Sequence, residues 1–385
     1  MKRSRPPGLS TRAVHAGEPP RAIGSPAVNP IVQTTTFFSD PEGAAELLYT
    51  RYGNNPNQRL LEQRIAALEG AEECVVLGSG MAAMTAALLS RLQTGDHVVA
   101  ARALYGGTRT LLERELSRLG IATTFVDFAA DGWQESLRPA SRAMVVEVPA
   151  NPLLRLVDVQ PLAEVARSRG IVLVVDATFA TPINFRPLEH GAHLVVHSAT
   201  KYLGGHSDVT GGVVAGARDL IAEVRERAQI FGAALDPHAA WLIERGIKTL
   251  AVRMERHNSN GLQVAAWCEG QPRIERVHYP GLPSHPDRAL ATRLLDGCGG
   301  MLAIELQGGG EAATRFVQGL RLAKLAPSLG GVDTLVSEPR HTSHAALSLQ
   351  QRESLGLPDG LVRFSLGIED AEDIISDIES ALREL

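Results

Sequence analysis

The chain has 385 residues, of which 44% are hydrophobic and 21% are charged, a composition that supports a large core and excludes wholesale disorder. Its 38 Lys and Arg residues and 43 Asp and Glu residues leave a formal net charge of −5. This balance excludes recognition of nucleic acid or of a membrane surface through a broad basic face. No stretch approaches the ~18 apolar residues of a membrane span, and the three cysteines suit a reducing cytoplasm.

Residues 1–53 are rich in Pro, Gly, Ser and Thr and show no helical period. We expect them to form an extended arm, which has too little core of its own to be ordered alone. The arm must therefore lie against the body of the protein or against a neighbouring subunit.

Strands and helices alternate in residues 54–247, which we expect to form the first domain. Short apolar runs predict strands at 74–77, 97–101, 123–128, 143–148, 171–177 and 193–199, and helical spacing predicts helices at 60–68, 81–92, 108–119 and 162–169. Because the runs lack polar alternation, they are typical of strands that are covered on both faces. The pattern predicts an α/β domain with a mostly parallel sheet between helices.

A different pattern begins near residue 245. A long helical stretch is followed by an apolar run at 300–308, and residues 369–385 carry one apolar stripe opposite acidic residues. Residues 248–385 therefore predict a smaller α+β C-terminal domain.

A glycine-rich turn, Gly78-Ser79-Gly80, lies between a predicted strand and a predicted helix. Small residues at a helix start leave backbone N–H groups free to bind a phosphate. The segment also fits the dinucleotide pattern G-x-G-x-x-A, which predicts an acidic residue at the end of the next strand. Asp96 instead precedes that strand, so a phosphate site and a turn without a ligand both remain open.

Asp176 and Lys201 each follow an apolar run, and in open α/β sheets ligands bind beyond such strand ends. A buried carboxylate needs a cation, which for Asp176 is either a structural partner or the protonated ring nitrogen of a ligand such as pyridoxal phosphate. Lys201 lies near the hydroxyls of Ser198 and Thr200. It is either a solvated lysine or an amine that forms a Schiff base with a carbonyl.

Six motifs then occur in order from Glu147 to Asp370: EVPANP (147–152), VVDATFATP (174–182), HSATKYLGGHSD (197–208), YPGLPSHP (279–286), SLGG (328–331) and VRFSLGIED (362–370). Together they resemble the Cys/Met-metabolism pyridoxal-phosphate enzymes, which include cystathionine γ-synthase, cystathionine γ-lyase and methionine γ-lyase. The resemblance extends from about residue 10 to the C-terminus. It implies the fold type I of pyridoxal-phosphate enzymes and a homotetramer built from two active dimers.

The resemblance also implies roles for individual residues. Lys201 would form the Schiff base with pyridoxal phosphate, Asp176 would pair with the ring nitrogen, and Tyr105 would stack on the ring and serve as a candidate catalytic acid. The other implied contacts are Gly80, Met81, Ser198 and Thr200 to the phosphate, joined by Tyr49 and Arg51 of a neighbouring subunit; Asn151 to the ring hydroxyl; and Arg363, Ser328 and Tyr49 to the amino-acid substrate.

The reaction that we expect is γ-elimination of cystathionine or a homocysteine-like amino acid to 2-oxobutanoate, ammonia and a thiol. The alternatives are γ-replacement, as in cystathionine γ-synthase or O-acylhomoserine sulfhydrylase, methionine γ-lyase activity and, more remotely, a non-catalytic protein of the same fold. Leu48, Thr110 and Pro327 stand where cystathionine-cleaving members carry Glu, Arg and Glu. Gly107 stands where methionine γ-lyases carry cysteine, so neither specialised substrate is favoured.

Four histidines lie near one another in sequence pairs: His278 with His285 and His341 with His344. Their spacing is not the helical H-x-x-x-H of a metal site, and no cysteine accompanies them. We therefore expect no metal.

Overall fold

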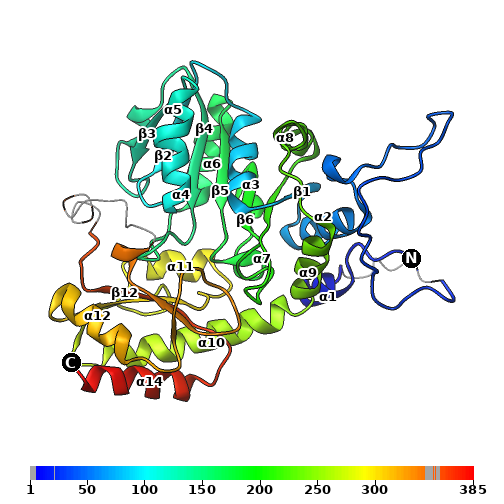
Figure 1. Cartoon of the computed structure of the whole chain (residues 1–385). Helices are drawn as coiled ribbons and strands as arrows, with labels where there is room; N and C mark the ends of the chain where they lie inside the picture. The colour runs from blue at the N-terminus through cyan, green and yellow to red at the C-terminus, as the bar shows by residue number, and fades with distance from the viewer. Residues whose placement is uncertain (1–5, 21, 343–349, 351, 353–355) are drawn as a thin grey trace.

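The computed structural model describes residues 6–20, 22–342, 350, 352 and 356–385. They form two sheets with a cavity between them, and an N-terminal arm projects from one side (Figure 1). Within the described chain no helix is both long and apolar enough to cross a membrane.

A seven-stranded sheet forms the larger part of the molecule. Its strands are β1 (Glu73–Leu77), β2 (His97–Ala101), β3 (Ala122–Val126), β4 (Ser141–Glu147), β5 (Val172–Asp176), β6 (Leu194–Ser198) and β7 (Gly212–Gly216). They lie in the order β1-β7-β6-β5-β4-β2-β3, and only β7 runs antiparallel to its neighbours. The predicted mostly parallel sheet is confirmed. β7 was not anticipated, because its sequence GVVAG is short and bounded by glycines.

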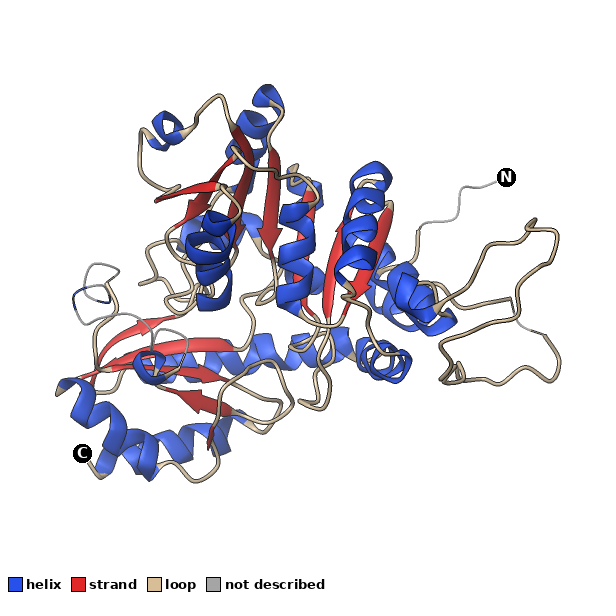
Figure 2. Ribbon diagram, turned by 45° about the horizontal axis from the view of Figure 1, so that its top comes forward, coloured by secondary structure: helices blue, strands red, loops and turns tan. Residues whose placement is uncertain are grey.

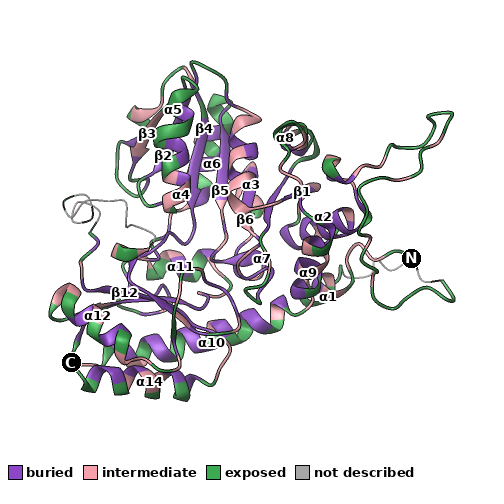
Figure 3. Cartoon of the chain, viewed as in Figure 1, coloured by how far each residue is buried: buried purple, intermediate pink, exposed green. Residues whose placement is uncertain are grey.

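Helices lie on both sides of this sheet (Figure 2). They are α2 (Pro56–Glu69), α3 (Gly80–Leu89), α4 (Gly106–Thr110), the π-turn η2 (Leu111–Glu115), α5 (Leu116–Arg118), α6 (Val159–Arg169), α7 (Thr181–Asn184), α8 (Arg218–Phe231) and α9 (Pro237–Ile247), with short 3₁₀ turns η1 (Thr50–Tyr52), η3 (Trp133–Ser136) and η4 (Pro187–His190). Most strand residues are buried (Figure 3), whereas the edge strand β3 is only partly covered. Their continuous apolar sequence therefore reflects a sheet that is covered on both faces.

The second sheet has five strands, in the order β10-β11-β12-β9-β8. They are β8 (Ile274–His278), β9 (Met301–Leu306), β10 (Lys324–Leu325), β11 (Leu335–Ser337) and β12 (Leu361–Ser365). The helices of this part are α10 (Leu250–Glu269), α11 (Arg288–Leu294), α12 (Gly309–Gly319), α14 (Ala371–Arg383) and the 3₁₀ turn η5 (Pro339–His341). In α14, Ile374, Ile378 and Leu382 pack into the core, as the apolar stripe predicted.

The expectation of an arm without a helix was wrong at one place, because residues Leu9–His15 form α1. This short helix has no side-chain N-cap. Contacts with α2 hold it instead, since Arg64 donates hydrogen bonds to the carbonyl oxygens of Ala13 and Ala16. Tertiary contacts of this kind leave no local pattern in the sequence.

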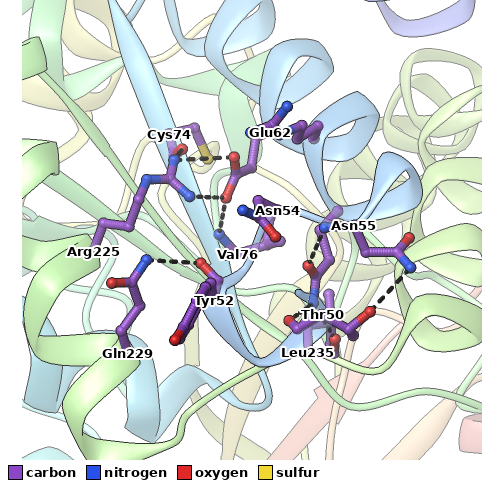
Figure 4. A network of polar contacts seen from close by, with 12 residues as sticks. Thr50, Tyr52, Asn54, Asn55, Glu62, Cys74, Val76, Arg225, Gln229 and Leu235 are labelled. Carbon is purple, nitrogen blue, oxygen red and sulfur yellow. Dashed lines mark hydrogen bonds and ion pairs between the residues drawn. The ribbon is translucent and has the colours of Figure 1, made fainter. Parts of the chain in front are cut away.

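The rest of the arm is extended and mostly exposed (Figure 3). Its inner end is attached to α2 and α8 by the polar network in Figure 4: Gln229 donates to the Tyr52 carbonyl, and Asn55 donates to the Thr50 hydroxyl. Deeper in the network, Arg225 forms a two-pronged ion pair with the buried Glu62. These contacts hold the inner end of the arm in place against α2 and α8.

Candidate active site

A cavity of about 680 Å³ opens at the carboxyl ends of β4, β5 and β6, where the two sheets meet. This is the edge of an open α/β sheet at which ligands bind. All of the predicted site residues except Tyr49 and Arg51 line it: Gly80, Met81, Tyr105, Asn151, Asp176, Ser198, Thr200, Lys201, Ser328 and Arg363. Residues more than 200 positions apart in sequence, such as Asn151 and Arg363, are in direct contact there.

Lys201 projects into the cavity from the turn that follows β6. Its Nζ donates a hydrogen bond to Ser328 Oγ at 2.7 Å. Burial, and then the positive charge of Arg363, lower the pKa of the Lys201 amine to about 8. An appreciable fraction of this amine is therefore neutral and nucleophilic near neutral pH.

Asp176 ends β5 inside the cavity. Thr178 donates to its Oδ1 twice, from the backbone N–H at 2.9 Å and from the hydroxyl at 2.6 Å. Burial raises the pKa of the Asp176 carboxyl. No salt bridge joins it to any residue that the structure describes, so the structural-partner interpretation loses its support and a cationic ligand remains.

Glu147, at the end of β4, lies beside Asp176, with which it is in register across the two parallel strands. Its Oε2 accepts from the Tyr105 N–H at 2.7 Å and its Oε1 from the Asn151 N–H at 3.0 Å. Burial and then the negative charge of Asp176 raise the pKa of Glu147 to about 8. The sequence contained this residue in the EVPANP motif, but we assigned it no role.

Arg363 reaches the cavity from β12 in the second sheet. Its Nη1 donates to Asn151 Oδ1 at 2.9 Å, and its Nη2 donates to the Ser328 carbonyl at 3.2 Å. Burial lowers the pKa of the guanidinium to about 10. The buried Nε has no hydrogen-bond partner among the described residues, so the guanidinium retains a donor for an anionic ligand.

The start of α3 forms one end of the cavity. Ser79 caps this helix by accepting from the Ala82 N–H. A Cβ at Gly80 would lie 2.7 Å from the Ser198 Cβ, so only glycine allows the helix start to lie this close to β6. The backbone N–H groups of the first turn thus lie beside the hydroxyl of Ser198, as an anion site requires.

Tyr49 and Arg51 do not reach this cavity in the chain described. They line a separate pocket of about 600 Å³ at the base of the arm. Arg51 donates to the Gln229 carbonyl at 2.9 Å and lies over the Tyr52 ring, with its guanidinium carbon 4.9 Å from the ring centroid. Their predicted contact with the phosphate, from a neighbouring subunit, stays a prediction.

Comparisons with known proteins identify the family of this chain. The sequence profile described as "Cys/Met metabolism PLP-dependent enzyme" matches residues 10–383. The chain belongs to this family. It is similar to L-methionine gamma-lyase of Pseudomonas putida, with 42% identity over 98% of each chain. It is also similar to the chloroplastic cystathionine gamma-synthase 1 of Arabidopsis thaliana, with 41% identity over 96% of this chain and 68% of the relative.

Solved structures of the family confirm the fold prediction. MetB from Corynebacterium glutamicum superposes with a TM-score of 0.94 at 38% identity over 98% of each chain. A cystathionine gamma synthase from Xanthomonas oryzae pv. oryzae, in complex with aminoacrylate and cysteine, superposes with a TM-score of 0.95 at 37% identity over 99% of each chain. The protein is therefore a pyridoxal-phosphate-dependent enzyme of the transsulfuration type, as the resemblance implied, and the dinucleotide alternative is superseded.

The residues of the cavity fit pyridoxal phosphate. The absence of a Cβ at Gly80 lets the helix start lie against Ser198, so that backbone N–H groups and a hydroxyl can bind one phosphate. Asp176 is a carboxylate with no salt bridge to the described residues, and burial raises its pKa. Lys201 is a partly neutral amine in the same cavity. An anion cradle, an unpaired carboxylate and a nucleophilic amine are the three groups that this cofactor needs.

The histidines contribute little to the site. His341 lines the cavity, whereas His278 pairs with Glu305 and His285 lies near the Leu153 carbonyl. His344 lies outside the described residues. In the described part of the chain, no three His, Cys, Asp or Glu side chains gather as metal ligands would.

Proposed function

We propose that the enzyme catalyses γ-elimination of a sulfur amino acid with a small, uncharged γ-substituent, of which homocysteine is the simplest. The Cγ–S bond breaks and sulfur leaves as hydrogen sulfide. With one water consumed, the amine leaves as ammonia and the carbon chain as 2-oxobutanoate. When bound, pyridoxal phosphate links to the substrate amine and withdraws electrons from Cα, which makes the protons on Cα and Cβ removable.

The observation that carries this proposal is the lining of the cavity near Ser328. Pro327, Leu329 and Phe179 provide apolar surface there. Two charged groups adjoin Ser328, the Lys201 amine and the Arg363 guanidinium, and both have roles in the scheme below. The acidic side chains of the described lining, Glu147 and Asp176, lie at the ends of β4 and β5. Apart from these two acids, the described lining holds no carboxylate for the distal ammonium group of cystathionine, and such a charge is costly to desolvate.

Lys201 is the proton carrier in this proposal. Its neutral amine can accept a proton from Cα and then, as the ammonium form, exchange protons at Cβ. Ser328 orients it through the 2.7 Å hydrogen bond. Since burial lowers the pKa of the amine to about 8, both protonation states are accessible near neutral pH.

Arg363 binds the substrate carboxylate in this scheme. Asn151 and the Ser328 carbonyl accept hydrogen bonds from its two terminal nitrogens, which orients the planar guanidinium group. Tyr105 is about half exposed at the mouth of the cavity, where its hydroxyl is a candidate to protonate the departing sulfur. Asp176 would pair with the ring nitrogen of bound pyridoxal phosphate and favour its protonated form.

The main rival is γ-replacement, in which a thiol captures the carbon chain after the same Cγ bond breaks. The names of relatives favour neither reaction: besides the lyase and synthase above, an O-succinylhomoserine sulfhydrylase of Pseudomonas aeruginosa is 41% identical over 88% of this chain. The described lining offers few charged side chains beyond Lys201 and Arg363 near Ser328, which favours elimination, because O-succinylhomoserine and cysteine both bring additional charges.

A homotetramer of two active dimers would complete the site. Tyr49 and Arg51 lie on the arm outside the chain's own cavity. The arm also exposes large apolar side chains to solvent, among them Ile23 and Phe38. Apolar surface of this kind is typical of a surface that a second chain covers. We place the enzyme in the cytoplasm, consistent with three free cysteines.

The test is a substrate comparison. The purified enzyme is incubated in turn with homocysteine, methionine and cystathionine, and separately with O-succinylhomoserine plus cysteine, while 2-oxobutanoate, sulfide and cystathionine are measured. The proposal predicts the highest kcat/KM for 2-oxobutanoate release from homocysteine. Faster formation of cystathionine from the ester plus cysteine than of any 2-oxo acid would contradict it.

A further inference from the structure

We propose that Glu147 is a positioning residue for the cofactor: one carboxylate holds the backbone of Tyr105 and of Asn151 at the same time. It thereby fixes two predicted cofactor contacts relative to each other. These are the Tyr105 ring, which would stack on the cofactor, and Asn151, which would bind the hydroxyl of the cofactor ring. The inference concerns the cofactor site alone and does not depend on which γ-reaction the enzyme performs.

The two hydrogen bonds of Glu147 use both of its oxygens. Oε2 accepts from the Tyr105 N–H and Oε1 from the Asn151 N–H, at 2.7 and 3.0 Å. Tyr105 is the N-cap of α4 and Asn151 belongs to the turn after β4. One side chain therefore joins two segments that are 46 positions apart in sequence.

The influence of Glu147 extends further through Asn151. The Asn151 side chain accepts a hydrogen bond from Arg363 Nη1 at 2.9 Å. A shift of the Asn151 backbone would therefore also move the guanidinium that is proposed to bind the substrate carboxylate. Tyr105, Asn151 and Arg363 all line the cavity. Glu147 therefore contacts two of these lining residues directly and the third, Arg363, through Asn151.

The placement of Glu147 is energetically demanding, which argues for a specific role. The residue is buried and lies beside Asp176 on the neighbouring strand, so two carboxylates share one low-dielectric site. An apolar residue at the end of β4 would avoid that repulsion. The two backbone hydrogen bonds are what an apolar residue could not supply.

Two variants test the proposal by different routes. Glu147→Gln keeps the size of the side chain but replaces one acceptor with a donor, so one of the two N–H groups loses its partner. Glu147→Asp keeps the carboxyl group but is one methylene shorter, so it cannot hold both N–H groups at their present separation. We expect each variant to bind pyridoxal phosphate about 10- to 100-fold more weakly.

The measurements are equilibrium titration of the cofactor-free, full-length protein with pyridoxal phosphate and visible circular dichroism of the bound cofactor. The dichroism reports ring orientation, which loss of stability alone would not change. We expect an altered dichroic signal in both variants, together with a kcat that falls more than KM rises.

Asp377→Asn provides the matched control. The Asp377 carboxylate likewise accepts backbone N–H groups, from Arg321, Leu322 and Ala323, but it lies on α14 outside the cavity. This variant is expected to lose stability while its cofactor affinity and dichroism stay at wild-type values.

Three results would overturn the proposal. Wild-type cofactor affinity and dichroism in both Glu147 variants would show that the hydrogen bonds do not position the ring. A normal Glu147→Asp protein beside an impaired Glu147→Gln protein would assign the effect to the ionisable carboxyl group and not to its simultaneous reach to both N–H groups. If neither variant folds, amide hydrogen exchange of the wild-type protein is the test. We expect slow exchange of the Tyr105 and Asn151 amides. Rapid exchange would contradict their hydrogen bonds to Glu147.

Discussion

The cavity and the arm hold the predicted site residues in two different ways. In the cavity, strand ends from two sheets bring Asp176, Lys201 and Arg363 together within a single chain. On the arm, Tyr49 and Arg51 lie in a different pocket, and Arg51 donates a hydrogen bond to the Gln229 carbonyl of α8. A buried sheet can gather distant residues by itself, whereas an extended segment with little core depends on another surface.

The largest expected effect is the loss of the Lys201 amine within the cavity. Lys201→Ala should lower kcat on the order of 10⁴-fold or more, because the group that moves both protons is gone. Steady-state release of 2-oxobutanoate measures this loss. Lys324→Ala is the control, since that lysine pairs with Asp333 outside the cavity and should leave kcat unchanged. Equal activity of Lys201→Ala and wild type would contradict the proposed role.

The arm should contribute the next largest effect. Arg51→Ala is expected to weaken binding of pyridoxal phosphate by about 100-fold, as removal of a charged phosphate contact typically does. Equilibrium titration of the cofactor-free protein measures the change.

Mixing two impaired variants at a limiting concentration of pyridoxal phosphate tests whether the arm acts across subunits. Arg51→Ala and Lys201→Ala proteins, dissociated and reassembled together, should regain part of the activity, because some hybrid sites receive an intact arm and an intact lysine. No regain from demonstrably mixed oligomers would place Arg51 in the site of its own chain or outside any site.

A third prediction concerns the pH dependence of cofactor capture. Because burial lowers the pKa of Lys201 to about 8, the neutral amine becomes the major form above that pH. The rate constant for capture of pyridoxal phosphate by the cofactor-free enzyme should rise about tenfold per pH unit and level off near about pH 8. Stopped-flow absorbance measures it. A rise that continues beyond about pH 10 would indicate a solvated lysine with an ordinary pKa.

The smallest effect should follow from adding a charge near Ser328. Pro327→Glu places a carboxylate at the lining of the cavity, where it could pair with the distal ammonium group of cystathionine. We expect kcat/KM for cystathionine relative to homocysteine to rise about three- to tenfold, as for a partly exposed ion pair. Pro327→Gln, which lacks the charge, should show no such rise, and an equal rise in both variants would refute the electrostatic explanation.

Much of the cavity was predictable from sequence, because the apolar runs that end at Asp176 and shortly before Lys201 identify strand ends directly. Glu147 carries the same signal, a carboxylate that closes an apolar run, and was missed because its partners are backbone N–H groups of distant segments. Thr178 was missed for a similar reason, since its role is to donate to Asp176.

The fold departed from expectation where tertiary contacts outweigh local pattern. Helix α1 depends on Arg64 from α2, and β7 depends on pairing with β1 and β6. Neither dependence can be read from a window of neighbouring residues. The position of Tyr49 and Arg51 shows the same limit, because a single chain does not bring them to the cavity that they are proposed to complete.

The identity of the lysine that binds the cofactor tests the central claim most directly, and the chain has only four lysines: Lys2, Lys201, Lys248 and Lys324. Borohydride reduction of the cofactor-loaded enzyme locks the C=N bond, and digestion followed by mass spectrometry locates the modified peptide. The account predicts modification at Lys201 alone. Modification at Lys248 or Lys324 in its place, or no reducible bond in an enzyme that turns over its substrate, would contradict it.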